Sequence, residues 1–141
     1  MDPRKPLLLV DVDGVLNPYA ADVCPEGYRE YHFFPDQEPV RLAQVHGEWL
    51  LGLAEAFDLV WATGWGEMAH RHISPVLGLP WFPTIVFPPV PFAPLEKLPA
   101  IDAFVRARPL AWIDDLITEE ARQWAAHRGS PTLIVEIDPA V

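Results

Sequence analysis

The feature that most restricts the fold is an apolar run, LLLV at residues 7–10, that ends directly in the acidic stretch DVDG. A nearly continuous run of branched apolar residues is typical of a strand covered on both faces in a parallel sheet. Asp11 and Asp13 follow at once, and two carboxylates so close together repel each other unless a positive charge lies nearby. The stretch therefore predicts a buried strand over residues 6–12 that ends at a charged site.

Apolar runs alternate with helical patterns along the rest of the chain, which predicts an α/β domain with a mainly parallel sheet. The length of 141 residues suits one domain, here residues 1–141. Residues 28–34 are expected to form one arm of a short hairpin. The further strands are expected at residues 58–63, 84–87, 110–114 and 132–138. Helices are expected at residues 47–57, 67–77, within 95–108, and at 118–128, where Thr118 would be the N-cap.

Charge and composition limit the partners of the chain. Twenty acidic residues against ten Lys and Arg give a net charge of −10, and the basic residues are scattered. A nucleic-acid groove normally carries a basic stripe, so a small phosphorylated substrate is favoured, with a phosphorylated nucleic-acid end as a second candidate. A single cysteine, Cys24, without a recognisable signal peptide or membrane-length apolar segment, predicts a cytoplasmic protein with no membrane partner.

Polar side chains follow the expected strands at the points where those strands end. Asp11 follows the first strand, Thr63 the second, and Asp114 and Asp115 a later one. Because ligands of parallel sheets gather at the carboxyl ends of the strands, these groups are expected to meet at one edge. Lys97 precedes the helix that leads into the Asp114 strand and is expected to reach the same edge. Carboxylate oxygens with water suit octahedral Mg²⁺, which would relieve the repulsion between the aspartates.

The order of these motifs resembles that of a known family. DVDGVLN at 11–17, WATG at 61–64, a lone Lys97 and WIDD at 112–115 follow one another along the chain. Together they resemble the haloacid dehalogenase superfamily of Mg²⁺-dependent phosphatases and phosphotransferases, and the resemblance covers residues 7–138. Within that superfamily the chain is most similar to small, nearly capless domains that sometimes accompany RNA-repair enzymes.

The resemblance implies a three-layer Rossmann-like fold and a phosphomonoester hydrolase. Asp11 would be the nucleophile that forms a covalent aspartyl-phosphate. Asp13 would protonate the leaving group and later activate water, as phosphatases but not dehalogenases require. Thr63 and Lys97 would join in catalysis by stabilising the phosphoryl oxygens. The residues that would bind the phosphate are Gly14, Thr63, Gly64 and Lys97.

The resemblance also implies a set of Mg²⁺ ligands. Asp11 and Asp114 would bind the ion through their carboxylates, and Asp13 through its backbone carbonyl. Asp115 would be either a water-mediated ligand or a neighbour that orients the site, and the sequence leaves both roles open. Trp65 follows Thr63 at the same edge and is a candidate for the pocket wall.

One segment departs from the larger members of the family, which often carry a substantial cap domain after the first motif. Here residues 15–46 separate that motif from the next helix. A segment of this length makes a flap, or minimal cap, but hardly a domain of its own. The site is therefore expected to be open, and the substrate stays undetermined.

Two other classes of function remain alternatives. A phospho-accepting switch domain of the response-regulator type uses a similar set of carboxylates, Thr and Lys. In that class the acceptor Asp lies on the third strand and the Lys comes late, whereas here Lys97 precedes the final acidic pair. The other alternative is a binding domain, catalytically weak or dependent on a partner, that retains the fold.

Overall fold

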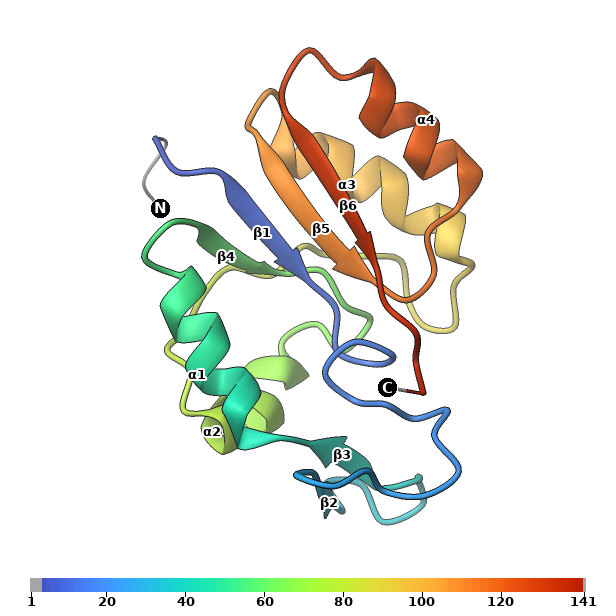
Figure 1. Cartoon of the computed structure of the whole chain (residues 1–141). Coiled ribbons are helices and arrows are strands. Elements are labelled where there is room, and N and C mark those ends of the chain that lie inside the picture. The colour runs from blue at the N-terminus through green and yellow to red at the C-terminus, as the bar shows by residue number, and fades with distance from the viewer. Residues whose placement is uncertain (1–3, 141) are drawn as a thin grey trace.

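The computed structural model describes residues 4–140, which form a four-stranded parallel sheet with helices around it (Figure 1). The sheet has the order β4-β1-β5-β6. Its strands are β1 (Leu7–Val10), β4 (Asp58–Trp61), β5 (Leu110–Asp114) and β6 (Thr132–Glu136). The central strand β1 is buried at every residue, as its continuous apolar sequence predicts. The expected α/β class with a parallel sheet is confirmed.

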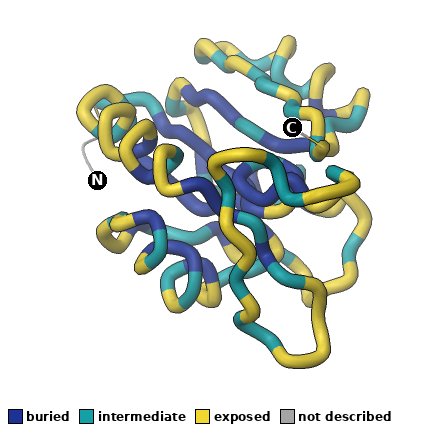
Figure 2. Tube along the Cα trace, turned by 60° about the horizontal axis from the view of Figure 1, so that its bottom comes forward, coloured by how far each residue is buried: buried dark blue, intermediate teal, exposed yellow. Residues whose placement is uncertain are grey.

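Helices cover both faces of this sheet, so the architecture has three layers and is compatible with a Rossmann-like fold (Figure 1). One face carries α1 (Gln44–Leu53) and α2 (Ser74–Leu77), and the other carries α3 (Lys97–Val105) and α4 (Glu119–His127). Strands β1, β4 and β5 run mostly buried through the middle of the molecule, while exposed residues lie on the outer helices, the loops and the edge strand β6 (Figure 2).

Side chains of β1 alternate between two hydrophobic clusters because successive residues of a strand point to opposite faces. Leu8 and Val10 pack with Leu50 of α1 in one cluster. Leu7 and Leu9 pack in the other cluster, whose helical members include Ile101 and Val105 of α3. Each fully buried side chain of this kind stabilises the fold by about 1.5–3 kcal/mol. The two clusters hold the sheet rigidly, and with it the site at its edge.

Two helices match their expected positions with different accuracy. α4 begins after Thr118, whose Oγ1 accepts a hydrogen bond from the N–H of Ala121 at 3.1 Å, so the expected N-cap is confirmed. α1 begins at Gln44 and ends at Leu53, so the expected range of 47–57 was wrong at both ends. Gly47 therefore lies inside the helix, where it packs closely against α2: a Cβ at this position would lie 1.9 Å from the carbonyl oxygen of Leu77.

The segment between β4 and α3 differs most from expectation. The strand expected at 84–87 is reduced to one bridge between Thr84 and Trp61. Prolines from Pro80 to Pro94 remove the backbone donors that a longer strand needs. The helix expected at 67–77 is a π-helical segment, Ala69–Ile73, that continues into the short α2, and a 3₁₀ turn, Pro94–Glu96, precedes α3.

The segment between β1 and α1 forms a small antiparallel hairpin of β2 (Arg29–Tyr31) and β3 (Val40–Leu42). β2 lies within the hairpin arm expected at 28–34. The hairpin lies beyond the carboxyl ends of the sheet strands (Figure 1). Across residues 4–140, none of the helices combines the length and the apolar character that crossing a bilayer requires.

Candidate active site

The chain turns directly after β1, and this turn fixes Asp11 at the end of the central strand. The Val12 N–H donates a hydrogen bond to Asp11 Oδ1 at 2.8 Å. The Val12 carbonyl accepts hydrogen bonds at 3.2, 2.9 and 3.0 Å from the N–H groups of Val15, Leu16 and Asn17. Asp11 is therefore held by backbone groups on a rigid strand end, as a reacting side chain needs to be.

Gly14 is required at this turn for two reasons. Its φ of 85° lies in the left-handed region, which residues with a side chain rarely adopt. A Cβ at Gly14 would also lie 2.1 Å from Oδ2 of Asp115. The turn after β1 and the turn after β5 thus pack against each other without space for a side chain. Gly14 thus makes a tight turn at this position, and its expected role toward a phosphate stays a prediction.

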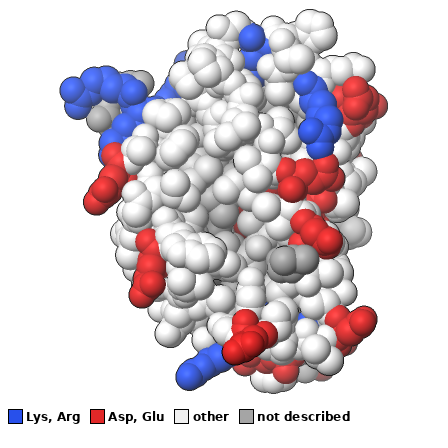
Figure 3. Space-filling view, viewed as in Figure 1, with Lys and Arg blue, Asp and Glu red and all other residues white. Residues whose placement is uncertain are grey.

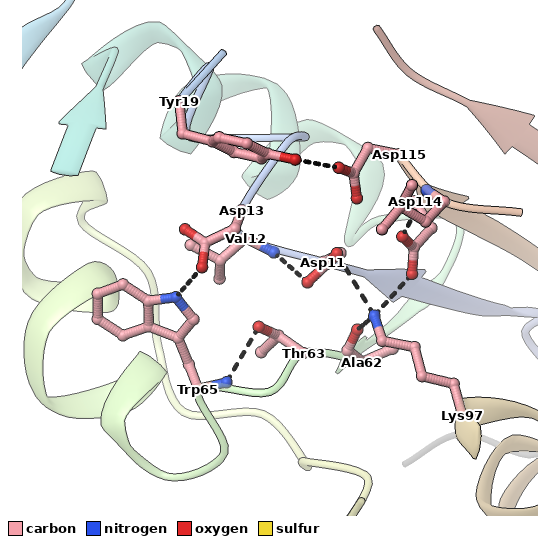
Figure 4. Close-up of polar contacts among 11 residues, drawn as sticks. Asp11, Val12, Asp13, Tyr19, Ala62, Thr63, Trp65, Lys97, Asp114 and Asp115 are labelled. Atoms are coloured by element: carbon pink, nitrogen blue, oxygen red, sulfur yellow. Dashed lines mark hydrogen bonds and ion pairs between the residues drawn. The ribbon is translucent and has the colours of Figure 1, made fainter. Parts of the chain in front are cut away.

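A buried ion-pair cluster lies at the carboxyl edge of the sheet (Figure 4). Lys97 Nζ lies 2.7 Å from Asp114 Oδ2 and 3.4 Å from Asp11 Oδ2. It also donates a hydrogen bond to the carbonyl of Ala62 at 3.0 Å. Asp11 is 6%, Asp114 1% and Lys97 7% exposed. The structure therefore brings together three residues that lie far apart in sequence and that were expected to meet at this edge.

The electrostatics of the cluster follow from its burial. Burial is the largest influence on Asp11 and, although Lys97 opposes it, the pKa of Asp11 rises to about 8, with Asp114 and Asp115 adding to the rise. Burial, followed by the adjacent Asp114, raises the pKa of Asp115 to about 6. Burial alone would lower the pKa of Lys97, but the carboxylates of Asp11 and Asp114 raise it overall. One ammonium group does not compensate the charge of three buried carboxylates.

The donor set at this position suits a divalent cation. One carboxylate oxygen each from Asp11, Asp114 and Asp115 lies within 4.8 Å of the others, and all three residues are buried. Hard oxygen ligands of this kind fit Mg²⁺, which usually binds through one or two carboxylates and several waters. A cation would also supply the positive charge that the cluster lacks. These three side chains can therefore hold a metal ion, and its identity stays a prediction.

Asp13 lies apart from this cluster although only one residue separates it from Asp11. Its side chain is exposed and accepts two hydrogen bonds, from Trp65 Nε1 at 3.0 Å and from Asn17 Nδ2 at 2.9 Å (Figure 4). Asn17 Oδ1 in turn accepts a hydrogen bond from the N–H of Arg41 in β3 at 3.0 Å. The side chain of Asp13 is thus not among the three grouped carboxylates, and its expected metal contact through the backbone carbonyl stays a prediction.

The loop after β4 brings Thr63 and Gly64 to the same edge. Thr63 is buried, and its Oγ1 accepts a hydrogen bond from the N–H of Trp65 at 3.2 Å. Gly64 is exposed, and a Cβ there would lie 3.2 Å from Val90. On the opposite side, the Tyr19 hydroxyl donates to Asp115 Oδ2 at 3.3 Å. These residues surround the carboxylates and line a common cavity with them.

This cavity has a volume of about 940 Å³ and opens at the carboxyl edge of the sheet. The sequence-predicted residues that line it are Asp11, Asp13, Thr63, Gly64, Lys97, Asp114 and Asp115. Residues of the segment 15–46 complete the wall, including Phe34 and Arg41. Trp65 lines the cavity, as expected for a residue that follows Thr63 at this edge. Strand ends and the hairpin together therefore build one pocket.

Two polar residues of the site had no predicted role from sequence. Asn17 joins Asp13 to β3, and Tyr19 holds Asp115. A signal for Asn17 exists, since Asn often hydrogen-bonds across a tight turn such as the one that Gly14 makes. Tyr19 carries no comparable signal, because its contact spans 96 positions of the sequence and depends on how two turns pack.

Comparisons of the chain with protein-family models, with curated proteins and with solved structures find no match. The resemblance of its motifs to the haloacid dehalogenase superfamily therefore stays a prediction, and the function is argued from the site itself.

Proposed function

We propose that this protein is a Mg²⁺-dependent phosphomonoester hydrolase that works through a covalent phosphoryl intermediate on Asp11, as haloacid dehalogenase-type phosphatases do. One observation carries the proposal. Asp11, Asp114 and Asp115 place carboxylate oxygens within 4.8 Å of one another, and Lys97 lies against two of them. Asp13 stands beside this cluster on the exposed side of the same cavity. A nucleophile, a cation site and a separate carboxyl group meet at one edge of the sheet.

The first half of the reaction uses Asp11 and Asp13 together. A carboxylate oxygen of Asp11 attacks phosphorus, and the bond from phosphorus to the ester oxygen breaks. That oxygen leaves with the proton that the Asp13 carboxyl group donates. Lys97 and the hydroxyl of Thr63 stabilise the charge on the phosphoryl oxygens. A bound Mg²⁺ would polarise these oxygens and offset the charge of the three carboxylates.

The second half regenerates the enzyme. Asp13, now a carboxylate, takes a proton from a water molecule, whose oxygen attacks phosphorus. The bond between phosphorus and Asp11 breaks, and inorganic phosphate leaves. Trp65 and Asn17 hold the two oxygens of Asp13, which keeps this carboxyl group directed along the cavity in both halves. Its exposure gives it access to the water that the second step consumes.

The test is phosphate release from p-nitrophenyl phosphate, sugar phosphates, nucleoside monophosphates and phosphorylated oligonucleotides, with Mg²⁺ and with EDTA. We expect release that requires Mg²⁺ and falls about 10⁴-fold in Asp11→Asn, because removal of a covalent nucleophile leaves only binding and electrostatic effects. Asp22→Asn is the matched control, since Asp22 is exposed and does not line the cavity. Undiminished release by Asp11→Asn would exclude Asp11 as the nucleophile.

The same experiment separates the alternatives. A phospho-accepting switch domain would keep the phosphoryl group on the protein after exposure to a small phosphodonor. A binding domain would show neither a labelled protein nor phosphate release. Only a hydrolase releases more than one phosphate for each protein molecule.

A further inference from the structure

The cavity has a polar end and an apolar remainder. Asp11, Lys97 and Asp114 form the polar end, where the phosphate would react. Much of the remaining wall is apolar and includes Phe34, Trp65, Met68, Val90 and Phe92. The volume of about 940 Å³ exceeds the needs of a phosphate group and matches pockets that bind organic ligands. The organic part of a substrate therefore has space and an apolar surface to contact.

Trp65 is the best-fixed ring of that wall. Its Nε1 donates to Asp13 Oδ2 at 3.0 Å. Its ring contacts Phe34 with centroids 5.8 Å apart and Phe33 with centroids 6.3 Å apart. His72 packs against both phenylalanines, with centroid distances of 5.0 and 5.1 Å. A ring held in this way loses little freedom when a ligand packs on it, so the contact is preorganised.

The position of Trp65 beside Asp13 decides which part of the substrate it meets. In the proposed reaction Asp13 gives its proton to the ester oxygen of the leaving group. That oxygen must lie within hydrogen-bonding reach of Asp13, and the group attached to it then extends along the indole of Trp65. Flat aromatic groups pack on an indole more favourably than hydrated polyols do.

The charges of the cavity restrict the substrate to one phosphate. Among the described residues that line it, the cations are Lys97 and Arg41. Lys97 is engaged by two aspartates. Arg41 pairs with Glu30 at 3.3 Å and donates to the carbonyls of Pro18 and Ala21 at 3.4 and 2.8 Å. On the face in Figure 3, basic side chains form one group at the upper left and otherwise lie singly, with acidic side chains between them. A second phosphate would lack a free basic partner here.

We propose, on the basis of the phosphatase function above, that the substrate is a small phosphomonoester with one phosphate whose leaving group carries a flat aromatic ring. Trp65 is the specificity-determining residue for that ring. The ring belongs either to a nucleobase or to a benzene-type group, since both offer the same flat surface to the indole.

The first arm of the test measures kcat/KM with Mg²⁺. Benzyl phosphate and nucleoside 5′-monophosphates represent the two aromatic sources, and glycerol 3-phosphate and glucose 6-phosphate are polyol controls with similar leaving oxygens. We expect kcat/KM about 10-fold higher for an aromatic source, as stacking on one ring provides. Trp65→Leu should reduce this ratio to about one. Trp49→Leu should preserve the ratio, because Trp49 is 60% exposed on α1 and lies outside the cavity.

The second arm measures binding without reaction, by calorimetry with phenylphosphonate and methylphosphonate. We expect the wild type to bind phenylphosphonate about 10-fold more tightly than methylphosphonate. We expect Trp65→Leu to bind the two ligands with equal affinity. Equal affinities in the wild type, or faster hydrolysis of polyol phosphates, would overturn the substrate class while phosphate release still supports the phosphatase. Preference for nucleoside diphosphates or 5′-phosphorylated oligonucleotides would overturn the single-phosphate, small-molecule assignment. Aromatic preference in binding without any hydrolysis would overturn the proposed phosphatase function and leave the aromatic preference of the cavity.

Discussion

Asp11 and Asp13 are separated by one residue and lie in opposite surroundings. Asp11 is buried, accepts a backbone hydrogen bond and faces Lys97 within a cluster of carboxylates. Asp13 is exposed and accepts hydrogen bonds from Trp65 and Asn17. The sharp turn after β1 causes this difference, because it carries the chain from the sheet edge to the cavity mouth within a few residues.

The two surroundings suit the two carboxyl groups to different chemistry. A buried carboxylate beside a cation site is shielded from water and suits a covalent bond to phosphorus. An exposed carboxylate with fixed orientation exchanges protons with a leaving group and with water. The proposed roles therefore follow from the surroundings of each group as well as from its place in the motif.

After the loss of activity expected in Asp11→Asn, the next largest effect is expected in Asp13→Asn, and it should depend on the leaving group. We expect Asp13→Asn to lower kcat about 10³-fold on benzyl phosphate, whose poor leaving group needs a proton. The p-nitrophenolate group of p-nitrophenyl phosphate leaves without a proton, so the rate of the first step with this substrate should fall far less. Asp11→Asn should lose activity equally on both. Burst kinetics with the two substrates check this, and equal losses in Asp13→Asn would contradict its role as the acid.

Lys97→Met tests the buried side of the comparison. It leaves the buried carboxyl groups of Asp11 and Asp114 without their cation, which we expect to lower the free energy of unfolding in EDTA by about 3–5 kcal/mol. Urea unfolding measures the change. Lys5→Met is the control, because Lys5 is partly buried and, within residues 4–140, its Nζ donates a single hydrogen bond, to the carbonyl of Ala54. A cost below about 1 kcal/mol for Lys97→Met would mean that the cluster is solvated like a surface ion pair.

Mg²⁺ should stabilise the folded protein through the same buried cluster. At a concentration 100 times Kd, a ligand that binds only the folded state adds about 2.7 kcal/mol. For a chain of this length we expect a Tm increase of about 5–10 °C. Asp114→Asn should lose most of this increase, and Asp22→Asn should retain it. Thermal scans with and without Mg²⁺ decide the matter, and an unchanged increase in Asp114→Asn would move the metal away from this cluster.

The smallest expected effect on activity concerns the exposed Asp13 and its hydrogen bond from Trp65. Trp65→Phe keeps a ring in the wall but removes the N–H that Asp13 accepts. We expect a loss of about fivefold in kcat on benzyl phosphate, in line with the net contribution of one ordinary hydrogen bond, about 1 kcal/mol. The first step with p-nitrophenyl phosphate should change little. Equal losses on both substrates would show that Trp65 does not act through Asp13.

The sheet and the buried cluster could largely be predicted from sequence. Apolar runs mark β1, β4, β5 and β6, and parallel strands present their carboxyl ends at one edge. That rule alone brings Asp11 and Asp114 together. Lys97 could be added because it begins the helix between β4 and β5.

The contacts that hold Asp13 and Asp115 could not be predicted to the same extent. The contacts of Asp13 with Trp65 and of Asp115 with Tyr19 span 52 and 96 positions, and they depend on how loops pack. Local patterns do not encode such contacts. The proline-rich segment before α3 was likewise misjudged at 84–87, where backbone donors are too few for a strand.

The most direct test of the account is to trap the phosphoryl group on the protein. The chain is mixed with p-nitrophenyl phosphate and Mg²⁺, quenched in acid and treated with borohydride, which reduces an acyl phosphate of aspartate to homoserine. Peptide mass spectrometry then locates the modified position. The account predicts homoserine at position 11 in the wild type and none in Asp11→Asn. Turnover without modification at position 11, or modification at another aspartate, would contradict it.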